Sequence, residues 1–293
     1  MYSPLIIVHG GAGRAYIKNT YIKNKKRKEE RKKVLKEAAE KGFLILLKGG
    51  SSLDAVTHAV KILEDHPLFN AGYGSALNIE KEVEMDAAVA REDGLFGAVA
   101  GIKRVKNPIL VARKVAEETE HIILVGEGAT RFARLYGFED FNPVTEERLI
   151  LFERLKPSYF KNIEKFKKLY GTQTVGAVAI DKRGIKAVAT STGGLMFHLP
   201  GRVGDTPLIG CGTYASPLGV CSATGHGEEI IRNMVAKEAV ELLKKQSAPE
   251  AAKTIVKRMK RKGCEVGIIL IDKEGNPGIA YNTEMMDYTV KAG

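Results

Sequence analysis

The strongest constraint on the fold comes from two apolar segments in the second half of the chain, separated by a short polar turn. Val175–Ile180 and Ile185–Thr190 are mostly apolar, and Asp181–Gly184 between them has the composition of a turn. Two strands joined in this way pair as an antiparallel hairpin. Because a hairpin brings its two open ends together, we expect Thr174 to lie next to Thr192.

The rest of the chain contains clusters of strands and helices. Bounded apolar runs predict strands at Leu5–Val8, Met85–Val89, Phe96–Ile102, Ile122–Val125, Pro207–Cys211, Val220–Ala223, Glu265–Ile271 and Gly278–Tyr281. Apolar residues at helical spacing predict helices over Val34–Leu47, after a Ser51 or Ser52 cap, after Pro108, and over Ala129–Tyr136, Glu228–Lys245 and Pro249–Arg261. Strands and helices do not alternate strictly, which indicates antiparallel sheets with helices outside them.

The segment from Glu139 to Gln173 differs from the rest in composition. It holds two prolines, several aromatic residues and many charges, and it lacks a long apolar periodicity. About 35 residues of this kind are unusual inside a compact enzyme. We interpret residues 139–173 as a flexible linker that ends directly at Thr174.

Composition excludes several classes of protein. The chain of 293 residues is 44% hydrophobic and 28% charged, which is typical of a soluble globular protein. Cys211, Cys221 and Cys264 form no CxxC pair, which argues against a disulfide framework or a zinc site and favours a reducing, cytoplasmic location. The N-terminus has the pattern of a strand and not of a signal peptide, and no apolar run reaches the roughly 18 residues that span a membrane.

The formal net charge of +11 raises the question of nucleic-acid binding. Much of the excess lies between Lys18 and Lys33. A basic run can bind phosphates, but no aromatic stacking platform or nucleic-acid motif accompanies it. We therefore interpret the run as a solvated helix face preceded by a mobile loop, and we expect no nucleic-acid or membrane partner.

The glycine-rich segment His9–Gly13 follows a predicted strand but matches neither a dinucleotide fingerprint nor a phosphate-binding loop. We expect it to provide a tight backbone approach beneath an active site. We interpret His9 as a hydrogen-bonded core histidine. The chain also lacks a serine-hydrolase elbow and a zinc-protease motif, so no catalytic metal or cofactor is expected.

Polar residues gather at strand ends in the second half of the chain. Thr174 opens one strand of the hairpin, and Thr190–Gly194 closes the other. Gly201–Asp205 then places a basic and an acidic residue in a glycine-flanked loop. Ala223–Glu228 lies where a strand passes into a helix, whose first N–H groups can hold a negative oxygen. Each feature alone has an ordinary structural explanation, and their joint order favours an active site.

These motifs resemble the plant-type asparaginases, also called isoaspartyl or β-aspartyl peptidases, of the N-terminal-nucleophile (Ntn) hydrolases. The resemblance covers nearly the whole chain. In the first half it includes HGGAG at 9–13, GGSSLDAV at 49–56, LEDHPLFNAGYGSALN at 63–78, EMDAAVA at 84–90, GAVAGI at 97–102, NPILVAR at 107–113 and HIILVGEGA at 121–129. In the second half it includes TVGAVAID at 174–181, TSTGG at 190–194, LPGRVGD at 199–205, CGTYA at 211–215 and ATGHGE at 223–228.

The resemblance implies an α+β fold, a four-layer αββα sandwich with two mainly antiparallel sheets between helical layers. It implies that the chain cleaves itself into an α subunit (1–173) and a β subunit (174–293), and that two such αβ heterodimers associate. The family's structural sodium loop, built mainly from backbone carbonyls, would fall on Leu63 to Tyr73.

The resemblance also assigns roles to individual residues. The nucleophile falls on Thr174, its helper threonine on Thr192, and the asparagine near the nucleophile's amine on Asn70. The oxyanion and substrate loop falls on Thr224, Gly225 and Gly227. The arginine that binds the substrate α-carboxylate falls on Arg202, and the aspartate that binds the α-ammonium falls on Asp205.

The expected chemistry starts from the amine that cleavage before Thr174 would free. Its reference pKa of about 8 lets it accept the hydroxyl proton at working pH. An arginine–aspartate pair recognises an amino acid, so the substrate whose amide reaches Thr174 is asparagine or a β-aspartyl peptide. Alternatives are a glycosylasparaginase-like enzyme, a protein-cleaving threonine hydrolase, and an uncleaved, non-catalytic amino-acid-binding relative.

One position departs from the family pattern. The family usually has Gly before the nucleophile, or Asp in its glycosylasparaginase relatives, whereas this chain has Gln173. Glycine adopts strained backbone angles at low cost. Gln173 therefore raises a question about the rate of self-cleavage at the Gln173–Thr174 bond.

Overall fold

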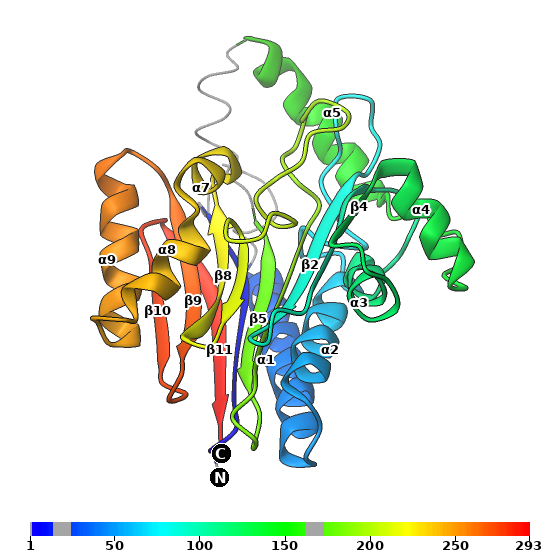
Figure 1. Ribbon diagram of the computed structural model, residues 1–293. Helices are drawn as coiled ribbons and strands as arrows, with labels where there is room; N and C mark the ends of the chain where they lie inside the picture. The colour runs from blue at the N-terminus through cyan, green and yellow to red at the C-terminus, as the bar shows by residue number, and fades with distance from the viewer. Residues whose placement is uncertain (1, 14–24, 162–172) are drawn as a thin grey trace.

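The computed structural model describes residues 2–13, 25–161 and 173–293. They form a mixed α+β fold with two sheets (Figure 1). The strands of the first half are β1 (Leu5–Gly13), β2 (Met85–Arg91), β3 (Phe96–Ile102) and β4 (Ile123–Val125). The strands of the second half are β5 (Val175–Ile180), β6 (Lys186–Thr192), β7 (Thr213–Ser216), β8 (Gly219–Gly225), β9 (Val266–Asp272), β10 (Pro277–Tyr281) and β11 (Met285–Ala292).

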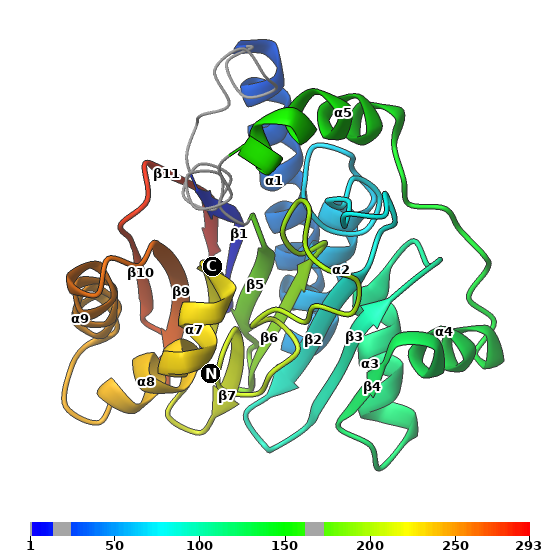
Figure 2. The same cartoon turned by 90° about the horizontal axis from the view of Figure 1, so that it is seen from above.

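The helices mostly cover the outer faces of the two sheets, while the helix of residues 146–161 lies beyond the upper ends of the strands in Figure 1 (see also Figure 2). Those of the first half are α1 (Lys25–Leu47), α2 (Ser52–Glu64), α3 (Pro108–Glu118), α4 (Gly126–Leu135) and α5 (Glu146–Lys161). Those of the second half are α7 (Gly227–Asn233), α8 (Val235–Leu242) and α9 (Ala248–Arg261). None of the helices in the described ranges is long and apolar enough to cross a membrane.

The larger sheet has the strand order β11-β1-β5-β6-β2-β3-β4, and the smaller has the order β10-β9-β8-β7. All pairs are antiparallel except the parallel pair β3–β4. β5 and β6 pair as the sequence predicts, with Val178 opposite Val188. Since β5 lies between β1 and β6, the hairpin occupies the middle of the larger sheet.

Three apolar clusters fill the spaces between the layers. One packs α1, α2 and α3 against the outer face of the larger sheet, with Leu35, Val56 and Ile109 at its centre. A second packs α8 and α9 against the smaller sheet. A third, including Ile7, Val178 and Ile269, lies between the two sheets. β5 is apolar on both faces because it is covered on both sides.

The start of α2 follows from its sequence. Of the two serines proposed as its cap, Ser51 is the N-cap, and its hydroxyl accepts the backbone N–H of Asp54 at 3.0 Å. The Asp54 carboxylate accepts the backbone N–H of Ser51 in return. This reciprocal capping box satisfies two N–H groups that the first turn of a helix leaves without partners.

The prediction of an irregular linker over 139–173 is wrong for part of that segment. Residues 146–161 form α5, in which Leu151, Phe152 and Leu155 are buried. The Phe152 ring packs at 4.6 Å from that of Phe197. The three apolar residues lie at helical spacing, but the surrounding charges and Pro157 hide this pattern. The segment 162–172 lies outside the described residues.

Two other predictions in the second half need correction. Pro207–Cys211 is not a strand, because the N–H groups of Leu208 and Gly212 both donate to the carbonyl of Asp205 and fold the segment into turns. The single helix predicted over 228–245 is broken at Met234, which has a left-handed backbone with φ 44°. The break lets the first N–H groups of α8 donate to carbonyls of the 205–212 loop.

The last strand was not predicted. From Asp287 onward, β11 alternates between half-buried and exposed residues, and the strand pairs with β1, with Val290 opposite Ile7. Its polar residues, which include Asp287 and Lys291, obscure a strand at the edge of the sheet. β11 is therefore the edge strand of the larger sheet, next to β1 on the side opposite the hairpin.

We expect Gly97→Ala to destabilise the protein by about 1–3 kcal/mol, the usual cost of overpacking a core. A Cβ on Gly97 in β3 would overlap the carbonyl oxygen of Ala112 and lie 2.5 Å from the Cβ of Ala116, both on α3. Gly128→Ala in α4 is the control, since apart from the adjacent residues and the nearby helix backbone no atom lies within 4 Å of the new carbon. Urea unfolding of both variants tests this, and equal stability of Gly97→Ala and wild type would contradict the described packing.

Candidate functional site

Thr174 and Thr192 meet at the open end of the central hairpin. The register places Val175 opposite Ser191, so the next residues outward are Thr174 and Thr192. Both threonines are buried, with exposed fractions of 1% and 2%. The predicted proximity of the two residues is confirmed at the level of strand pairing.

Thr224 reaches the same point from the smaller sheet. Its Oγ1 accepts the backbone N–H of Thr174 at 3.3 Å and that of Ala12 at 3.2 Å. The next residue, Gly225, has φ 143°, and a Cβ there would overlap the carbonyl oxygen of Glu265. The end of β8 therefore requires glycine directly after the hydroxyl that touches the nitrogen of Thr174.

The glycine-rich end of β1 lies against the bond before Thr174. Gly11 has φ 104°, and a Cβ on it would lie 2.9 Å from Cα of Gln173 and 3.1 Å from the carbonyl oxygen of Thr174. The backbones approach too closely for any side chain at this position. The expected tight approach beneath the site is confirmed for Gly11.

His9 is a buried, neutral core histidine, as the sequence predicts. Its Nδ1 accepts the N–H of Gly11 at 3.2 Å, so its Nε2–H donates to the Ser222 hydroxyl at 2.9 Å. Ser222 in turn bonds to Thr190 at 3.0 Å. Burial lowers the pKa of His9 to about 3. A Cβ on Gly176 would lie 2.5 Å from Nε2 of His9. A glycine at this position therefore leaves room for the hydrogen bond between His9 and Ser222 that joins the two sheets.

Asn70 fixes the segment that follows Thr192. Its Nδ2 donates to the carbonyl of Gly194 at 2.8 Å, and its Oδ1 accepts the N–H of Ala76 at 2.7 Å. Its backbone carbonyl accepts the N–H of Gly193 at 2.9 Å. The Thr192 hydroxyl also accepts the N–H of Gly194, at 3.1 Å. Asn70 and Thr192 thus hold the same turn.

Arg202, Asp205 and Gly227 form a second group. A Cβ on Gly227 would lie 2.7 Å from Nη2 of Arg202 and 2.9 Å from Oδ1 of Asp205, so only glycine fits between the two charged groups. Nε and Nη2 of Arg202 donate to Oε1 of Glu228 at 3.1 and 3.0 Å. The structure brings together the arginine and aspartate that the sequence predicts, with Glu228 as an additional carboxylate.

Asp205 is buried without a full set of partners. Its Oδ2 has no hydrogen-bond partner among the described residues. Burial raises the pKa of its carboxyl to about 7, while the positive charge of Arg202 acts in the opposite direction. A buried carboxylate oxygen without a donor is costly. The group is therefore suited to receive a cationic donor from a ligand, beside an arginine that can bind an anion.

Asp86 was missed by the sequence analysis. It lies on β2 opposite Thr192, and its two carboxylate oxygens accept the N–H groups of Gly101 at 2.9 Å and Gly204 at 2.8 Å. It thereby attaches the loop that carries Arg202 to the larger sheet. A carboxylate within the otherwise apolar segment Met85–Val89 is the signal that could have identified it.

The loop from Leu63 to Tyr73 closes on itself through its backbone. The N–H of Tyr73 donates to the carbonyl of Glu64 at 2.8 Å. Gly72 has φ 54°, and a Cβ on it would lie 2.5 Å from the Glu64 carbonyl oxygen and 2.8 Å from that of Lys106. Two backbone carbonyls therefore converge here, and such oxygens are ligands for hard cations. Among the described residues, no cluster of His, Cys, Asp or Glu could hold a metal ion.

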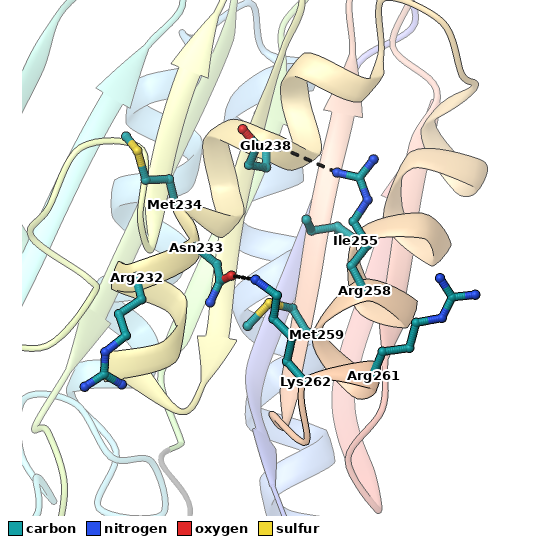
Figure 3. A pocket seen from close by; sticks show the side chains of 9 residues that line it. All are labelled: Arg232, Asn233, Met234, Glu238, Ile255, Arg258, Met259, Arg261 and Lys262. Carbon is teal, nitrogen blue, oxygen red and sulfur yellow. Dashed lines mark hydrogen bonds and ion pairs between the residues drawn. The ribbon is translucent and has the colours of Figure 1, made fainter.

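A groove elsewhere on the surface does not belong to this site. It has a volume of about 570 Å³ and lies between the α7–α8 break and α9 (Figure 3). Arg232, Arg258, Arg261 and Lys262 give it a basic lining. Arg258 pairs with Glu238 at 3.6 Å. The groove contains none of the threonines or charged residues described above.

Comparisons with known proteins identify the family of the chain. A family model described as asparaginase matches residues 2–293. A plant-type L-asparaginase from Pyrococcus horikoshii is 48% identical, over 97% of this chain and 94% of its own length. An isoaspartyl peptidase/L-asparaginase from Danio rerio is 40% identical, over 97% and 91%, and one from Bos taurus is 40% identical, over 98% and 92%. The chain belongs to the asparaginase family that these enzymes represent.

Proposed function

We propose that the protein is a self-processing threonine amidohydrolase. It hydrolyses L-asparagine to L-aspartate and ammonia, and it removes β-aspartyl residues from dipeptides. The observation that carries this proposal is the buried Thr174, whose backbone nitrogen lies 3.3 Å from Oγ1 of Thr224. The arginine–aspartate pair around Gly227 supports it. The names of the relatives favour this reaction over that of a glycosylasparaginase or a protein-cleaving hydrolase.

Maturation separates an α subunit (1–173) from a β subunit (174–293). The Thr174 hydroxyl attacks the carbonyl carbon of Gln173, the C–N bond breaks, and the hydroxyl proton passes to the nitrogen that becomes the new amine. Water then hydrolyses the resulting ester, which leaves a carboxylate on Gln173 and restores the Thr174 hydroxyl. The contact of Gly11 with both residues supports this step, because it fixes the backbone around the bond.

Hydrolysis of the substrate reuses the same hydroxyl. The free amine of Thr174 accepts its proton, since a threonine needs an adjacent base to act as a nucleophile. Thr192 assists the nucleophile, while Asn70 holds the neighbouring turn near the amine. Thr224 and the N–H of Gly225 stabilise the oxyanion, and each good donor contributes about 3–4 kcal/mol. Ammonia or an amino acid leaves, and water releases aspartate from the acyl-enzyme.

The Arg202–Asp205 group selects the substrate. Arg202 binds the α-carboxylate through two parallel hydrogen bonds, in exchange for part of its contact with Glu228. Asp205 receives the α-ammonium at its carboxylate, whose Oδ1 lies on the side of Gly227 and Arg202. Gly227 leaves space between Arg202 and Asp205. Thr224 and Gly225 line the end of the site that is nearest to the reacting amide.

The wider family features are part of the same proposal. The two sheets and their outer helices form a four-layer αββα sandwich of Ntn-hydrolase type. Two αβ heterodimers associate. The carbonyls of the Leu63–Tyr73 loop, Glu64 among them, hold a structural sodium ion that supplies no chemistry to the reaction. The reduced state of Cys211, Cys221 and Cys264 supports a cytoplasmic location.

We expect Thr174→Ala to abolish both self-cleavage and asparagine hydrolysis, because no oxygen remains to attack either amide. Thr174→Ser should retain part of both activities, since it keeps the hydroxyl but loses the methyl group that restricts its rotamer. Denaturing electrophoresis and N-terminal sequencing test maturation, and the smaller wild-type fragment should begin Thr-Val-Gly-Ala-Val. Turnover of asparagine by Thr174→Ala would contradict the assignment.

We expect binding of L-aspartate, the product, to weaken about tenfold between pH 8 and pH 6. With its pKa raised to about 7, Asp205 is mostly ionised at pH 8 and mostly protonated at pH 6, where it cannot pair with an ammonium group. Inhibition constants of L-aspartate measured across this range test the effect. Succinate lacks the ammonium group and is the matched control.

The Asp205→Asn variant should bind L-aspartate weakly and without this pH dependence. If succinate shows the same pH dependence as L-aspartate, the titrating group is not the one that faces the ammonium. An unchanged pH dependence in Asp205→Asn would lead to the same conclusion.

A further inference from the structure

The basic run Lys18–Lys33 contains one residue that does not fit a solvated helix face. Among its described members on α1, Arg31 is buried with an exposed fraction of 5%, while Lys26, Arg27, Lys28, Lys32 and Lys33 are at least partly exposed. Arg31 precedes Val34 and Leu35 by three and four residues, so it lies on the apolar face of the helix. The solvated-face prediction therefore holds for the exposed members but not for Arg31.

The guanidinium of Arg31 joins four separate parts of the chain. Its Nε donates to Oδ2 of Asp287 on β11 at 3.0 Å. Its Nη1 donates to the carbonyl of Leu68 at 2.9 Å and to Oε1 of Gln173 at 3.3 Å. Its Nη2 donates to the carbonyl of Gly10. The planar group also lies over the ring of Phe69, 4.6 Å from its centroid.

Burial of the Arg31 guanidinium would be energetically unfavourable if its only role were to stabilise the fold. Burying a charge is energetically unfavourable unless the charge is paired and hydrogen-bonded. The ion pair with Asp287 offsets the charge, but packing of the apolar face of α1 does not by itself require an arginine at this position. The remaining N–H groups of Arg31 are directed to neutral oxygens, and two of those oxygens belong to Gly10 and Gln173.

Gln173 belongs to the bond that maturation breaks, and Gly10 lies on the strand that packs against it. Gln173 supplies the carbonyl carbon of this bond, and Gly10 precedes the residue whose backbone touches Gln173 and Thr174. One rigid guanidinium therefore binds both β1, at the carbonyl of Gly10, and the residue before Thr174, at the side chain of Gln173. Because the fork of an arginine has fixed geometry, holding both oxygens fixes their relative position.

We propose that Arg31 is a positioning residue for cleavage of the Gln173–Thr174 bond. It holds the side-chain amide of Gln173 and the carbonyl of Gly10, so that the carbonyl carbon of Gln173 stays within reach of the Thr174 hydroxyl. This inference rests on the proposed self-cleavage. It also accounts for Gln173 at a position where the family usually has glycine, because Arg31 restricts a residue whose backbone and side chain would otherwise have more freedom.

The experiment is a double-mutant cycle on cleavage of the full-length chain. Arg31→Met keeps the apolar stem and removes every donor, and Gln173→Met removes the acceptor with little change in size. Cleavage of purified, unprocessed protein is followed by denaturing electrophoresis, together with the melting temperature of each variant. We expect each single variant to cleave at least tenfold more slowly than wild type, and the double variant to be no slower than the slower single variant.

Two further variants separate positioning from stability. Asp287→Asn weakens the ion pair on the other side of the guanidinium, so it should lower the melting temperature but keep the cleavage rate within about twofold of wild type. Arg31→Lys keeps the charge and the fold but cannot hold four acceptors in a fixed geometry, so it should also cleave slowly. If Arg31→Met does not fold, Arg31→Lys replaces it in the cleavage assay.

The outcomes distinguish this inference from the proposed function. Wild-type protein that never cleaves would overturn the proposed function itself. Wild type that cleaves while Arg31→Lys and Gln173→Met cleave equally fast would overturn only the role of Arg31. Independent, multiplicative effects of Arg31→Met and Gln173→Met would also overturn it, because they would show that Arg31 does not act through the Gln173 side chain.

Discussion

The position of β5 between β1 and β6 is the constraint on which the rest of the structure depends. Both neighbours pair with it antiparallel, and the two faces of this part of the sheet pack against α2 and the smaller sheet. A shift of the strand by one residue would put Val175 or Ala177 in the place of Gly176, where a Cβ would lie 2.5 Å from Nε2 of His9. Thr174, at the end of β5, is therefore fixed beside Thr192 of one neighbouring strand and near the glycine-rich end of the other.

The smaller sheet completes the site because the two sheets approach closely at glycines. Gly176 leaves room for His9 and Ser222 to bond between the sheets, and Thr224 then reaches the nitrogen of Thr174. The charged residues are held by backbone contacts in the same way. Asp86 accepts N–H groups from two loops, and the 205–212 turns pack against the start of α8. The side chains that face the proposed substrate are thus supported by rigid elements rather than by loops alone.

The sequence alone predicts the hairpin, most of the strands and helices, the proximity of Thr174 and Thr192, and the glycine-flanked loop that carries Arg202 and Asp205. These features depend on local periodicity, turn residues and motif order, which one chain displays directly. Sequence analysis missed β11 because an edge strand with charged residues lacks a strong pattern. It missed α5 because three buried apolar residues, among them Phe152, stand within a charged segment. Buried partners such as Asp86 and Arg31 depend on contacts between distant segments, which spacing along the chain does not reveal.

The proposed mechanism requires Thr174 to carry an acyl group during turnover. The most direct measurement mixes the processed enzyme with asparagine, quenches the reaction in acid within its first turnovers, and determines the intact mass of the fragment 174–293. We expect a fragment heavier by one aspartyl acyl group, which peptide mapping places on Thr174. An unmodified fragment at all times during rapid turnover, or an acyl group on another residue, would contradict this mechanism.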